Sequence, residues 1–451
     1  MIAPAPASPQ KSWMYLPEYA GEALPRYTSY PPANRFHAAI GSANRDRAIA
    51  DLAAGARISV YIHIPYCQQL CWYCGCNTSV PTPANPVESY LEALHREIRH
   101  IGAKLPHDAR VTHVHVGGGS PDTLRAGQIH SLFAALNKSF QFDPAAEIAV
   151  ELDPRGVRGD LAWALRESGV NRASLGVQTL NQSVQMRINR VQSRDQIIEA
   201  IATLRDAGID KLNTDIMYGL PNQSIADVVE TAEFAADHGA DRVAVFGYAH
   251  VPWFKKHQGS IRPEELPGGE ARFRQAEAAA ATLRLEGYEA VGFDHFALPS
   301  DSLAIATRNG KLRRNFQGYT DDQADALIGL GASAISSLPG LYCQNEVDAR
   351  QYRFRVLADH SATARGAEVS RDDAMRSRLI ETILCRFEAD LTPDMTIPAL
   401  DRLKRLEAAG IIKLDENRLK ITALGRPYAR NVAASFDAAF ATVPGRHSLA
   451  V

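Results

Sequence analysis

Strand-like and helical segments alternate regularly from residue 58 to about residue 250, and this order limits the fold more than any other feature of the sequence. The strand-like segments are ISVYIHI, VTHVHV, EIAVELDP, NRASLGVQ, KLNTDIMYGLP and DRVAVFGYAH, at 58–64, 111–116, 147–154, 171–178, 211–221 and 241–250. Helical segments such as NPVESYLEALHREIRHIGAK and SRDQIIEAIATLRDAG lie between them. Such alternation predicts an α/β fold of βα units around a parallel sheet. Six units predict a partial parallel (β/α)6 barrel of TIM-like type, short of the eight units that close a full barrel.

The sequence patterns divide the chain into three predicted parts. Residues 1–57 form an N-terminal arm, in which the segment PRYTSYPPANRF mixes aromatic residues, prolines and arginines like an extended arm lying on the body of the protein. Residues 58–360 form the barrel with an extension for the substrate site. The alternation stops near residue 365, and we assign 361–451 to a C-terminal helical, winged-helix-like domain, in which IIKLDENRLKIT predicts two strands around a tight turn. Since this domain has no strong basic excess, we expect a structural or lid role rather than nucleic-acid binding.

Composition and charge exclude several classes of protein. Hydrophobic residues make up 45% and charged residues 22% of the 451 residues, and no apolar run reaches the roughly 18 residues of a membrane span. The net charge of -2 gives no reason to expect nucleic acid as the main partner. The segment MIAPAPASPQKS lacks the charged and apolar regions of a secretory signal. We therefore expect a reducing cytoplasm, where clustered cysteines bind metals or take part in catalysis more often than they form disulfides.

Polar residues follow the ends of all six predicted strands. Ligands of parallel α/β folds bind at the carboxyl ends of the strands, because each strand leads into a loop there. Residues with a purely structural role would be spread over both ends of the strands. Carboxylates after a strand can also cap the next helix, which is the competing interpretation of the acidic residues. The residues at the strand ends are the cysteine loop, Gly117 to Ser120, Glu151 and Asp153, Gln178, Asp215, and Tyr248 to His250.

Four of the six cysteines lie in the segment CQQLCWYCGC, directly after the first predicted strand. Structural zinc usually takes two Cys-x2-Cys pairs that are well separated in sequence. Three or four cysteines on one loop are instead common ligands of iron–sulfur clusters. Cys76 follows Cys74 by two residues and has limited reach to a separate corner of a cluster. We therefore expect three ligands, Cys67, Cys71 and Cys74, and a fourth iron that is open for a reaction.

The segment CQQLCWYC resembles the CxxxCxxC signature of radical S-adenosylmethionine (SAM) enzymes, in which three cysteines hold a [4Fe-4S] cluster and SAM binds the fourth iron through its amino and carboxylate groups. Nearly the whole chain resembles the oxygen-independent coproporphyrinogen III oxidases. Cys76 separates this family from related haem-chaperone-like proteins, which usually carry Phe there. Ser120 stands where the family commonly has Thr and keeps the hydroxyl. The segments that carry the likeness are PRYTSYP, YIHIPYC, CWYCGCN, GGGSP, ELDPR, LGVQ, NRVQ, DIMYGLP, YAHVP, DHFA and RNFQGYT.

The resemblance implies the oxygen-independent oxidative decarboxylation of two propionates of coproporphyrinogen III to vinyl groups, which gives protoporphyrinogen IX in haem biosynthesis. The reduced cluster would pass an electron to SAM, and the 5′-deoxyadenosyl radical would take a hydrogen from the β-carbon of a propionate. The resemblance further implies two bound SAM molecules and an electron donor such as flavodoxin or ferredoxin. We expect a monomer, and we expect Arg26 and the arm around it to cover the substrate, whose carboxylates need cationic partners.

The resemblance also assigns roles to single residues. Cys67, Cys71 and Cys74 would bind the cluster. Cys76 and Glu151 would have catalytic roles, with Cys76 near the site but outside the set of cluster ligands. The residues expected to contact SAM are Tyr61, Tyr73, Gly118, Gly119, Ser120, Glu151, Gln178, Arg190, Asp215, Ala249 and Ile335.

The chemistry of four of these residues suits the parts of SAM. Asp215 and Gln178 suit ribose hydroxyls, and Glu151 suits an ammonium or sulfonium group. Arg190 suits a carboxylate, which a guanidinium can bind through two parallel hydrogen bonds.

Two other functions are compatible with the sequence. One is that of a related radical SAM enzyme that modifies tetrapyrroles. The other is that of a haem chaperone with a vestigial cluster. Product analysis would separate the first from the expected oxidase, and haem titration the second.

Overall fold

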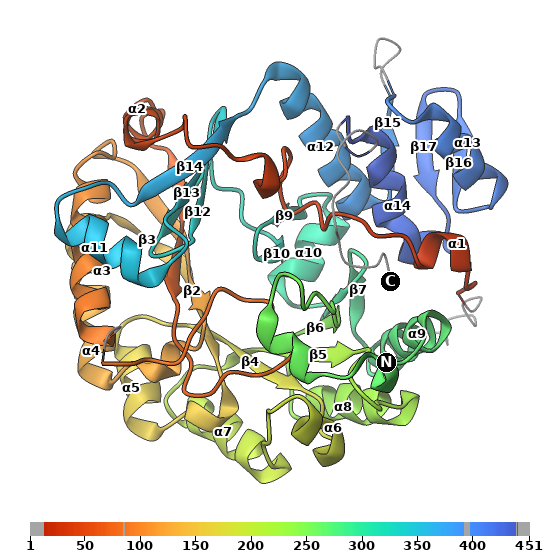
Figure 1. The fold of residues 1–451 in the computed structure, drawn as a ribbon, viewed down its shortest axis with the longest axis horizontal. Coiled ribbons are helices and arrows are strands. Elements are labelled where there is room, and N and C mark those ends of the chain that lie inside the picture. The colour runs from red at the N-terminus through yellow and green to blue at the C-terminus, as the bar shows by residue number, and fades with distance from the viewer. Residues whose placement is uncertain (1–12, 84–85, 392–396, 439, 441–451) are drawn as a thin grey trace, which may run out of the picture.

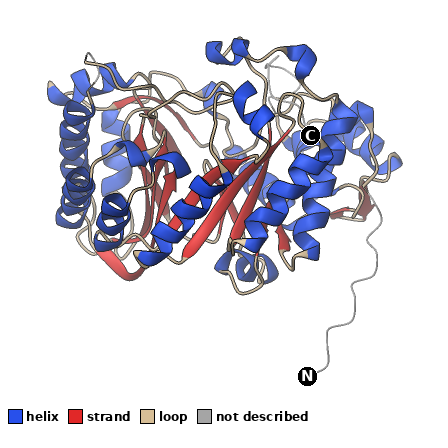
Figure 2. Cartoon of the chain, turned by 90° about the horizontal axis from the view of Figure 1, so that it is seen from below, coloured by secondary structure: helices blue, strands red, loops and turns tan. Residues whose placement is uncertain are grey.

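The computed structural model describes residues 13–83, 86–391, 397–438 and 440. Its centre is a twelve-stranded sheet with the strand order β14-β13-β12-β11-β1-β2-β3-β4-β5-β6-β8-β7. Helices lie around the outside of this sheet (Figure 1), and Figure 2 shows the strands enclosed between helices.

All six strands predicted from the sequence are present, and they pair in chain order. Each neighbouring pair is parallel, with Ile58 beside Val111 and Glu151 beside Ser174, for example. Their apolar residues are buried because a parallel sheet is covered on both faces. The partial (β/α)6 arrangement is thus confirmed. The strands are β1 (Arg57–Ile64), β2 (Arg110–Gly118), β3 (Phe142–Leu152), β4 (Arg172–Gln178), β5 (Lys211–Tyr218) and β6 (Arg242–Gly247).

A helix follows each of these strands, and α7 and α8 begin at serines that cap them. The side chain of Ser193 accepts a hydrogen bond from the backbone N–H of Gln196 at 3.1 Å at the start of α7, and Ser224 caps α8 in the same way. Among the described residues, none of the helices has both the length and the apolar character needed to cross a bilayer. The helices are α3 (Val87–Gly102), α4 (Ala126–Ser139), α5 (Gly159–Glu167), α6 (Gln182–Arg187), α7 (Arg194–Asp206), α8 (Ile225–Asp237) and α9 (Gly269–Leu285).

Both edges of the sheet carry strands that the sequence analysis did not predict. Next to β1 lies β11 (Ala326–Leu330), which is parallel to it, followed by the antiparallel strands β12 (Ile335–Leu338), β13 (Leu341–Asn345) and β14 (Thr363–Glu368). Next to β6 lie β8 (His295–Ala297) and β7 (Glu289–Val291), both in antiparallel pairings. Because β14 pairs with β13, the sheet continues past residue 360, where the sequence analysis placed the end of the barrel domain.

The C-terminal part contains the predicted pair of strands and one strand that was not predicted. Strands β16 (Ile412–Asp415) and β17 (Arg418–Ile421) form the hairpin, and β15 (Glu388–Asp390) pairs with β17 to make a three-stranded sheet. The other elements are α1 (Pro17–Ala20), α2 (Ser42–Ala50), α10 (Ser302–Arg308), β9 (Arg313–Asn315), β10 (Gly318–Thr320), α11 (Ala349–Leu357), α12 (Arg371–Arg386), α13 (Leu400–Ala408) and α14 (Ala429–Ala433).

The N-terminal arm is built into a hydrophobic core that it shares with the C-terminal part. Leu24, Tyr27 and Tyr30 of the arm are buried in the same core as residues of α12, α13 and α14. Tyr27 donates a hydrogen bond to Oδ2 of Asp437 at 3.1 Å, and the backbone N–H of Ala438 donates to the Tyr30 hydroxyl at 3.1 Å. Figure 1 shows the arm running beside the C-terminal helices. The arm and the described C-terminal part therefore hold each other in place.

A buried network of charged residues crosses the barrel interior below the strand ends. The guanidinium of Arg172, which is 1% exposed, forms ion pairs with Glu147 at 3.1 Å and with Asp301 at 3.0 Å. Arg242 pairs with the same Asp301 at 2.7 Å. Asp301 also accepts a hydrogen bond from the backbone of Leu303 and so caps α10. The network ties β3, β4 and β6 to the segment before α10.

Replacing Asp301 with Asn should lower the free energy of unfolding by about 3 kcal/mol or more, because two buried guanidinium groups lose a shared carboxylate while the capping group is kept. Urea denaturation followed by circular dichroism measures this. As a control, Glu92→Gln breaks an exposed pair with Arg96 on α3 and should cost less than about 1 kcal/mol. Equal losses in the two variants would contradict a special role for the buried network.

Candidate active site

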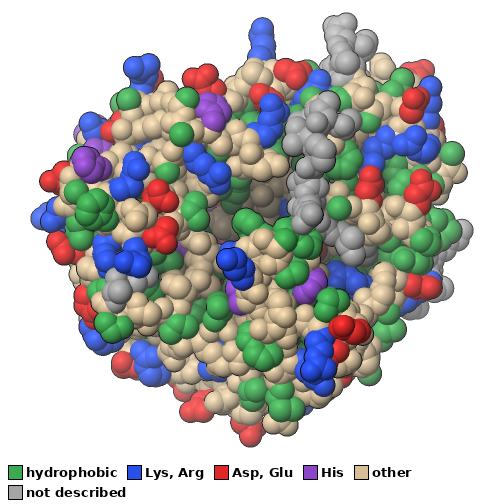
Figure 3. All heavy atoms as spheres, viewed as in Figure 1, with side chains coloured by type: hydrophobic (Ala, Val, Ile, Leu, Met, Phe, Trp, Pro, Cys, Tyr) green, Lys and Arg blue, Asp and Glu red, His purple; other side chains and the backbone are tan. Residues whose placement is uncertain are grey.

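The carboxyl ends of the parallel strands open into a cavity of about 710 Å³. Figure 3 shows a hollow near the middle of this face of the molecule. The cavity brings together most of the site residues predicted from the sequence, although they come from separate strands. They are Cys67, Cys71, Tyr73, Cys74, Cys76, Gly118, Gly119, Ser120, Glu151, Gln178, Arg190, Asp215 and Ala249. Tyr61 and Ile335 are not part of this cavity wall.

Backbone contacts hold the cysteine loop in place and leave its thiols toward the cavity. The backbone N–H of Cys67 donates to Ser79, and that of Trp72 donates to Ile188. From the segment after β6, Lys255, His257 and Gln258 hydrogen-bond to the backbone carbonyls of three loop residues, at 2.8, 2.7 and 2.9 Å. The sequence analysis did not predict this second layer, because these residues lie far along the chain and carry no motif of their own.

The thiols of the loop have unequal proton affinities. A hydrogen bond with Cys76 lowers the pKa of Cys74 to about 7, and the same bond raises the pKa of Cys76. Burial raises the pKa of Cys67 to about 12. Cys74 and Cys76 thus lie side by side, as their spacing predicts, and the pair favours a thiolate on Cys74 near neutral pH.

The donor set of the loop suits a cluster of several irons better than a single metal ion. Among the described residues, no group of three or more His, Cys, Asp or Glu side chains is arranged around one ion position. Several cysteine side chains nevertheless share one cavity wall. An iron–sulfur cluster takes one thiolate per iron and so needs its cysteines spread in this way. The residues therefore fit the expected [4Fe-4S] cluster.

Arg190 lies against the cysteine loop. Its guanidinium donates to Sγ of Cys71 at 3.5 Å, to Oδ2 of Asp153 at 2.8 Å and to the carbonyl of Gly176 at 2.5 Å. Arg155 also donates to Sγ of Cys71, at 3.8 Å. The Cys71 sulfur therefore lies beside two guanidinium groups. Since Asp153 already binds Arg190, the contact of Arg190 with a SAM carboxylate stays a prediction.

Glu151 at the end of β3 is held by a histidine that the sequence analysis missed. Its Oε1 lies 2.7 Å from Nε2 of His115, and its Oε2 accepts the backbone N–H of Gly118 at 3.1 Å. Burial acts to raise the pKa of Glu151, but the hydrogen bond and charge of His115 outweigh it and leave the pKa lowered. The His115 ring stacks on Tyr61, with ring centroids 6.0 Å apart. Tyr61 therefore supports the site from below, through His115. The alternation in VTHVHV, which turns every second side chain into the barrel, was the available signal for His115.

The glycines of the segment VGGGSPD are required by packing inside the protein. A Cβ at Gly117 would lie 2.5 Å from the Glu151 carboxylate, and one at Gly118 would lie 2.3 Å from the His63 ring. Gly118 also has a φ of 101°, in the left-handed region. A Cβ at Gly119 would lie 2.4 Å from the carbonyl of Tyr66. The glycines therefore allow Glu151, His63 and the cysteine loop to pack closely against the backbone of this segment. Backbone contacts between the glycines and a ligand stay a prediction.

Asp215 and Gln178 face the cavity from β5 and β4. Burial raises the pKa of Asp215 to about 7, and the charge of Glu151 adds to this effect. No other described residue forms a hydrogen bond or ion pair with the Asp215 carboxylate, so it is available to a ligand. Gln178 has a φ of 65°, an unfavourable backbone conformation for this residue type, at an irregularity in the β4–β5 pairing. Such strain is often found at functional sites.

Ser120 is engaged within the protein. Its hydroxyl donates to Asp122, and it accepts the backbone N–H of Asp153 at 3.1 Å. The hydroxyl therefore links the end of β2 to the end of β3. Its expected contact with SAM stays a prediction.

The chain matches known proteins over most of its length. Residues 61–235 match the model of the Radical SAM superfamily. The oxygen-independent coproporphyrinogen III oxidase of Bradyrhizobium diazoefficiens is 44% identical over 96% of this chain and 98% of its own, and that of Escherichia coli is 38% identical over 92% of each. The solved structure of Escherichia coli coproporphyrinogen III oxidase, described as a radical SAM enzyme, has a TM-score of 0.86 at 37% identity and covers 91% of this chain and 97% of its own.

Cys71→Ser should remove most of the iron from anaerobically reconstituted protein, whereas Cys76→Ser should keep about four irons per chain and impair turnover. The reason is that Cys71 is one of the three predicted ligands, whereas Cys76 hydrogen-bonds to Cys74 and is predicted to lie outside the ligand set. Iron and sulfide analysis with electron paramagnetic resonance measures the difference. Equal iron loss in both variants would make Cys76 a ligand, and tightly bound zinc in the wild type would contradict the cluster.

Proposed function

The chain belongs to the oxygen-independent coproporphyrinogen III oxidases of the radical SAM superfamily, and on this premise we propose that it converts two propionates of coproporphyrinogen III to vinyl groups, giving protoporphyrinogen IX. The observation that carries the proposal is the single cavity in which the cysteine loop, Glu151 and Asp215 meet at the ends of three different strands. Ligands of such folds bind at this end of the strands.

The cysteine loop would hold the [4Fe-4S] cluster through Cys67, Cys71 and Cys74. When bound, the cluster and SAM supply the one-electron chemistry that removes a hydrogen atom from the β-carbon of a propionate, after which CO2 and one electron leave and a vinyl group remains. Arg190 and Arg155 lie beside the Cys71 sulfur and would compensate its negative charge when it binds the cluster. The segment after β6 holds the backbone of the loop through Lys255, His257 and Gln258.

Glu151 and Asp215 would bind and orient SAM. Glu151 is anionic at neutral pH because His115 pairs with it, and it suits the cationic groups of SAM. Asp215 has no partner among the described residues, and burial raises its pKa. A hydrogen bond from a hydroxyl or cationic group of SAM would offset the free-energy cost of its desolvation. The other proposed contacts are Tyr61, Tyr73, Gly118, Gly119, Ser120, Gln178, Arg190, Ala249 and Ile335.

The number of cofactors and the electron source are part of the proposal. The cavity of about 710 Å³ is in the upper half of the range of small-molecule sites, roughly 300–1,000 Å³, and leaves room for a second SAM or part of the substrate. We propose two SAM molecules, as the family resemblance implies. The reductant would be a one-electron donor such as flavodoxin or ferredoxin. The cytoplasmic location and the monomeric state stay predictions.

Reconstituted protein incubated anaerobically with coproporphyrinogen III, SAM and a reductant should form protoporphyrinogen IX, detected by chromatography after oxidation to the porphyrin. Deoxyadenosine should form in step with the product. The control omits SAM and should give no product. A different modified tetrapyrrole would indicate another radical SAM reaction, and tight stoichiometric haem binding without turnover would indicate a chaperone.

Glu151→Gln and Asp215→Asn should each weaken SAM binding by about 1–3 kcal/mol, because a hydrogen bond to a charged or buried group is lost. Isothermal calorimetry on the cluster-loaded enzyme measures the affinity, and iron content should stay at the wild-type level. Glu368→Gln is the control, since Glu368 is exposed and ends β14, at an edge of the sheet. Wild-type affinity in both cavity variants would remove these carboxylates from the SAM site.

A further inference from the structure

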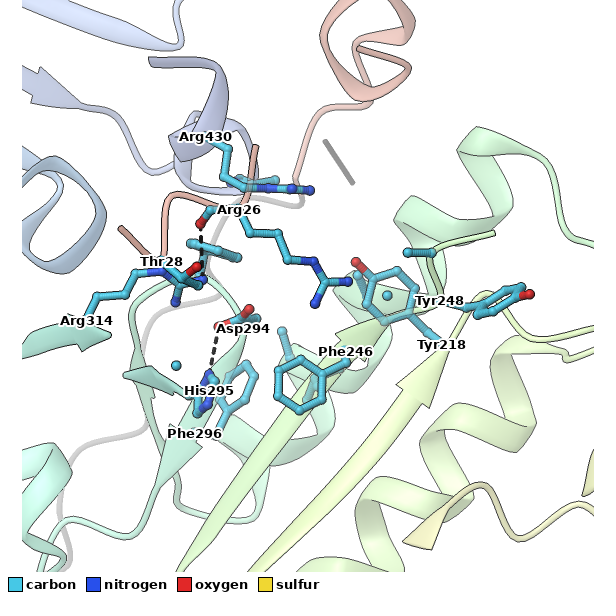
Figure 4. Close-up of a pocket in the computed structure, with 18 of the residues that line it drawn as sticks. Arg26, Thr28, Tyr218, Phe246, Tyr248, Asp294, His295, Phe296, Arg314 and Arg430 are labelled. Atoms are coloured by element: carbon cyan, nitrogen blue, oxygen red, sulfur yellow. Dashed lines mark hydrogen bonds and ion pairs between the residues drawn. The ribbon is translucent and has the colours of Figure 1, made fainter. Parts of the chain in front are cut away.

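A second cavity, of about 310 Å³, adjoins the one that holds the cysteine loop. The two cavities share Arg26 and the residues Phe246, Gly247, Tyr248 and Ala249 at the end of β6. Figure 4 shows Arg26 entering the second cavity from the N-terminal arm, opposite Phe246 and Tyr248. A ligand that extends past this shared wall would touch both cavities.

Four arginines from separate parts of the chain line the second cavity. Arg26 belongs to the arm, Arg272 to α9, Arg314 to β9 and Arg430 to α14. In Figure 4, the side chains of Arg26, Arg314 and Arg430 converge on the space above Asp294. Arg314 is the first residue of the segment RNFQGYT, but no sequence pattern links the four arginines to one another.

Two of the arginines have hydrogen-bond donors without acceptors. Nε and Nη1 of Arg314 are buried and have no hydrogen-bond partner, and its Nη2 reaches only the carbonyl of Arg26 at 3.4 Å. Arg272 is 8% exposed, and its Nε also has no partner, while its Nη2 donates to the carbonyl of Tyr248 at 2.9 Å. Within the described part of the chain, neither guanidinium pairs with a carboxylate. Unsatisfied buried donors are costly unless a ligand accepts from them.

The charge in the cavity is unbalanced toward the positive. Among the described residues that line it, Asp294 alone carries a carboxylate, and Oδ1 of Asp294 lies 2.7 Å from Nδ1 of His295. Burial, together with the positive charge of Arg26, lowers the pKa of Arg430 to about 10. Positive charges gathered in a partly desolvated space are stabilised by an anionic ligand, and the guanidinium fork matches a carboxylate.

Much of the remaining wall is aromatic. Phe246, Tyr248, Phe293, Phe296 and Phe316 line the cavity together with the arginines. Aromatic side chains give a large apolar contact surface for a flat or folded ring system. A ligand with an apolar ring body and carboxylates at its edge fits this combination.

We propose that Arg26, Arg272, Arg314 and Arg430 bind the propionates of the tetrapyrrole that are not decarboxylated. This inference rests on the proposed function and adds the recognition of the substrate to it. With these carboxylates held in the second cavity, the ring system lies along the aromatic wall. A reacting propionate then extends past Phe246 and Tyr248 into the cavity of the cysteine loop.

The test compares three ligands on the anaerobically reconstituted enzyme: coproporphyrin III, protoporphyrin IX and SAM. Protoporphyrin IX keeps only the propionates that the reaction leaves intact. Arg26→Gln and Arg314→Gln should weaken binding of both porphyrins about ten- to hundredfold, measured by fluorescence quenching, because a charge-assisted hydrogen bond is lost. SAM affinity and iron content should not change.

Two further variants complete the comparison. Arg99→Gln removes an exposed arginine on α3, away from both cavities, and should leave porphyrin binding and turnover unchanged. Arg314→Lys keeps the charge without the fork and should recover only part of the affinity. Because Arg26 is exposed, its replacement does not threaten the fold, and circular dichroism verifies this for each variant.

Three outcomes would overturn the inference. Wild-type porphyrin affinity in both Gln variants would show that the arginines do not bind the substrate. Weaker binding of coproporphyrin III alone would assign the arginines to the reacting propionates, and weaker SAM binding would assign them to a cofactor. Turnover by the wild type is a separate measurement. If the wild type binds both porphyrins through these arginines but forms no protoporphyrinogen, the proposed function is refuted, whereas the assignment of the arginines to porphyrin binding still holds.

Discussion

The alternation of side chains along the parallel strands divides the barrel interior into two layers with opposite roles, and the site depends on this division. Glu147 and Glu151 lie four residues apart on β3 and therefore face the same side of the sheet. Glu147 belongs to the lower layer, where it pairs with Arg172. Glu151 belongs to the upper layer, where His115 holds it at the cavity wall. Strand β5 repeats the pattern, because Asn213 accepts a hydrogen bond from Arg172 while Asp215 faces the cavity. Charges in the lower layer are paired within the protein, whereas Asp215 of the upper layer has no partner among the described residues and remains for a ligand.

Local sequence patterns were enough to predict the parallel barrel and the positions of its cysteines and strand-end carboxylates. Alternation of β and α segments determines a parallel sheet. In such a sheet Glu151 and Asp215 lie at the same carboxyl end of the strands, whatever the course of the loops. The supports of the site could not be predicted in this way. The alternation in VTHVHV turns His115 into the barrel, but its pairing with Glu151 of a different strand is known only from the fold. The need for Gly117 likewise arises only when β3 places a carboxylate 2.5 Å from the position that a Cβ would take there. The antiparallel edge strands β7, β8 and β12 to β14 are short and do not alternate regularly with helices, so the sequence pattern did not predict them.

The N-terminal arm illustrates how distant segments set the position of one side chain. Leu24 and Tyr27 on either side of Arg26 are buried in the core shared with the C-terminal helices. The Arg26 side chain is exposed and faces the cavities, because the residues on either side of it are buried in that core. Arg430 comes from α14 of the same core and enters the cavity from a similar direction. A sequence pattern can point to an arginine in an aromatic-rich arm. The residues that lie near that arginine are known only once the arm and the C-terminal helices are placed together.

The two adjoining cavities differ in charge in a way that would orient a ligand with unlike ends. Two carboxyl groups line the larger cavity and favour cationic or hydroxyl groups of a ligand. Glu151 is anionic, and Asp215 is available for a partner. The arginines occupy the smaller cavity and favour carboxylates. A propionate bound near Glu151 would meet repulsion, whereas the same group in the smaller cavity would meet unsatisfied donors. The arginines of the smaller cavity would therefore hold a tetrapyrrole by its outer carboxylates, and the carboxylates of the larger cavity would hold the cationic cofactor, so that only the propionate that reaches past Phe246 would approach the reacting centre.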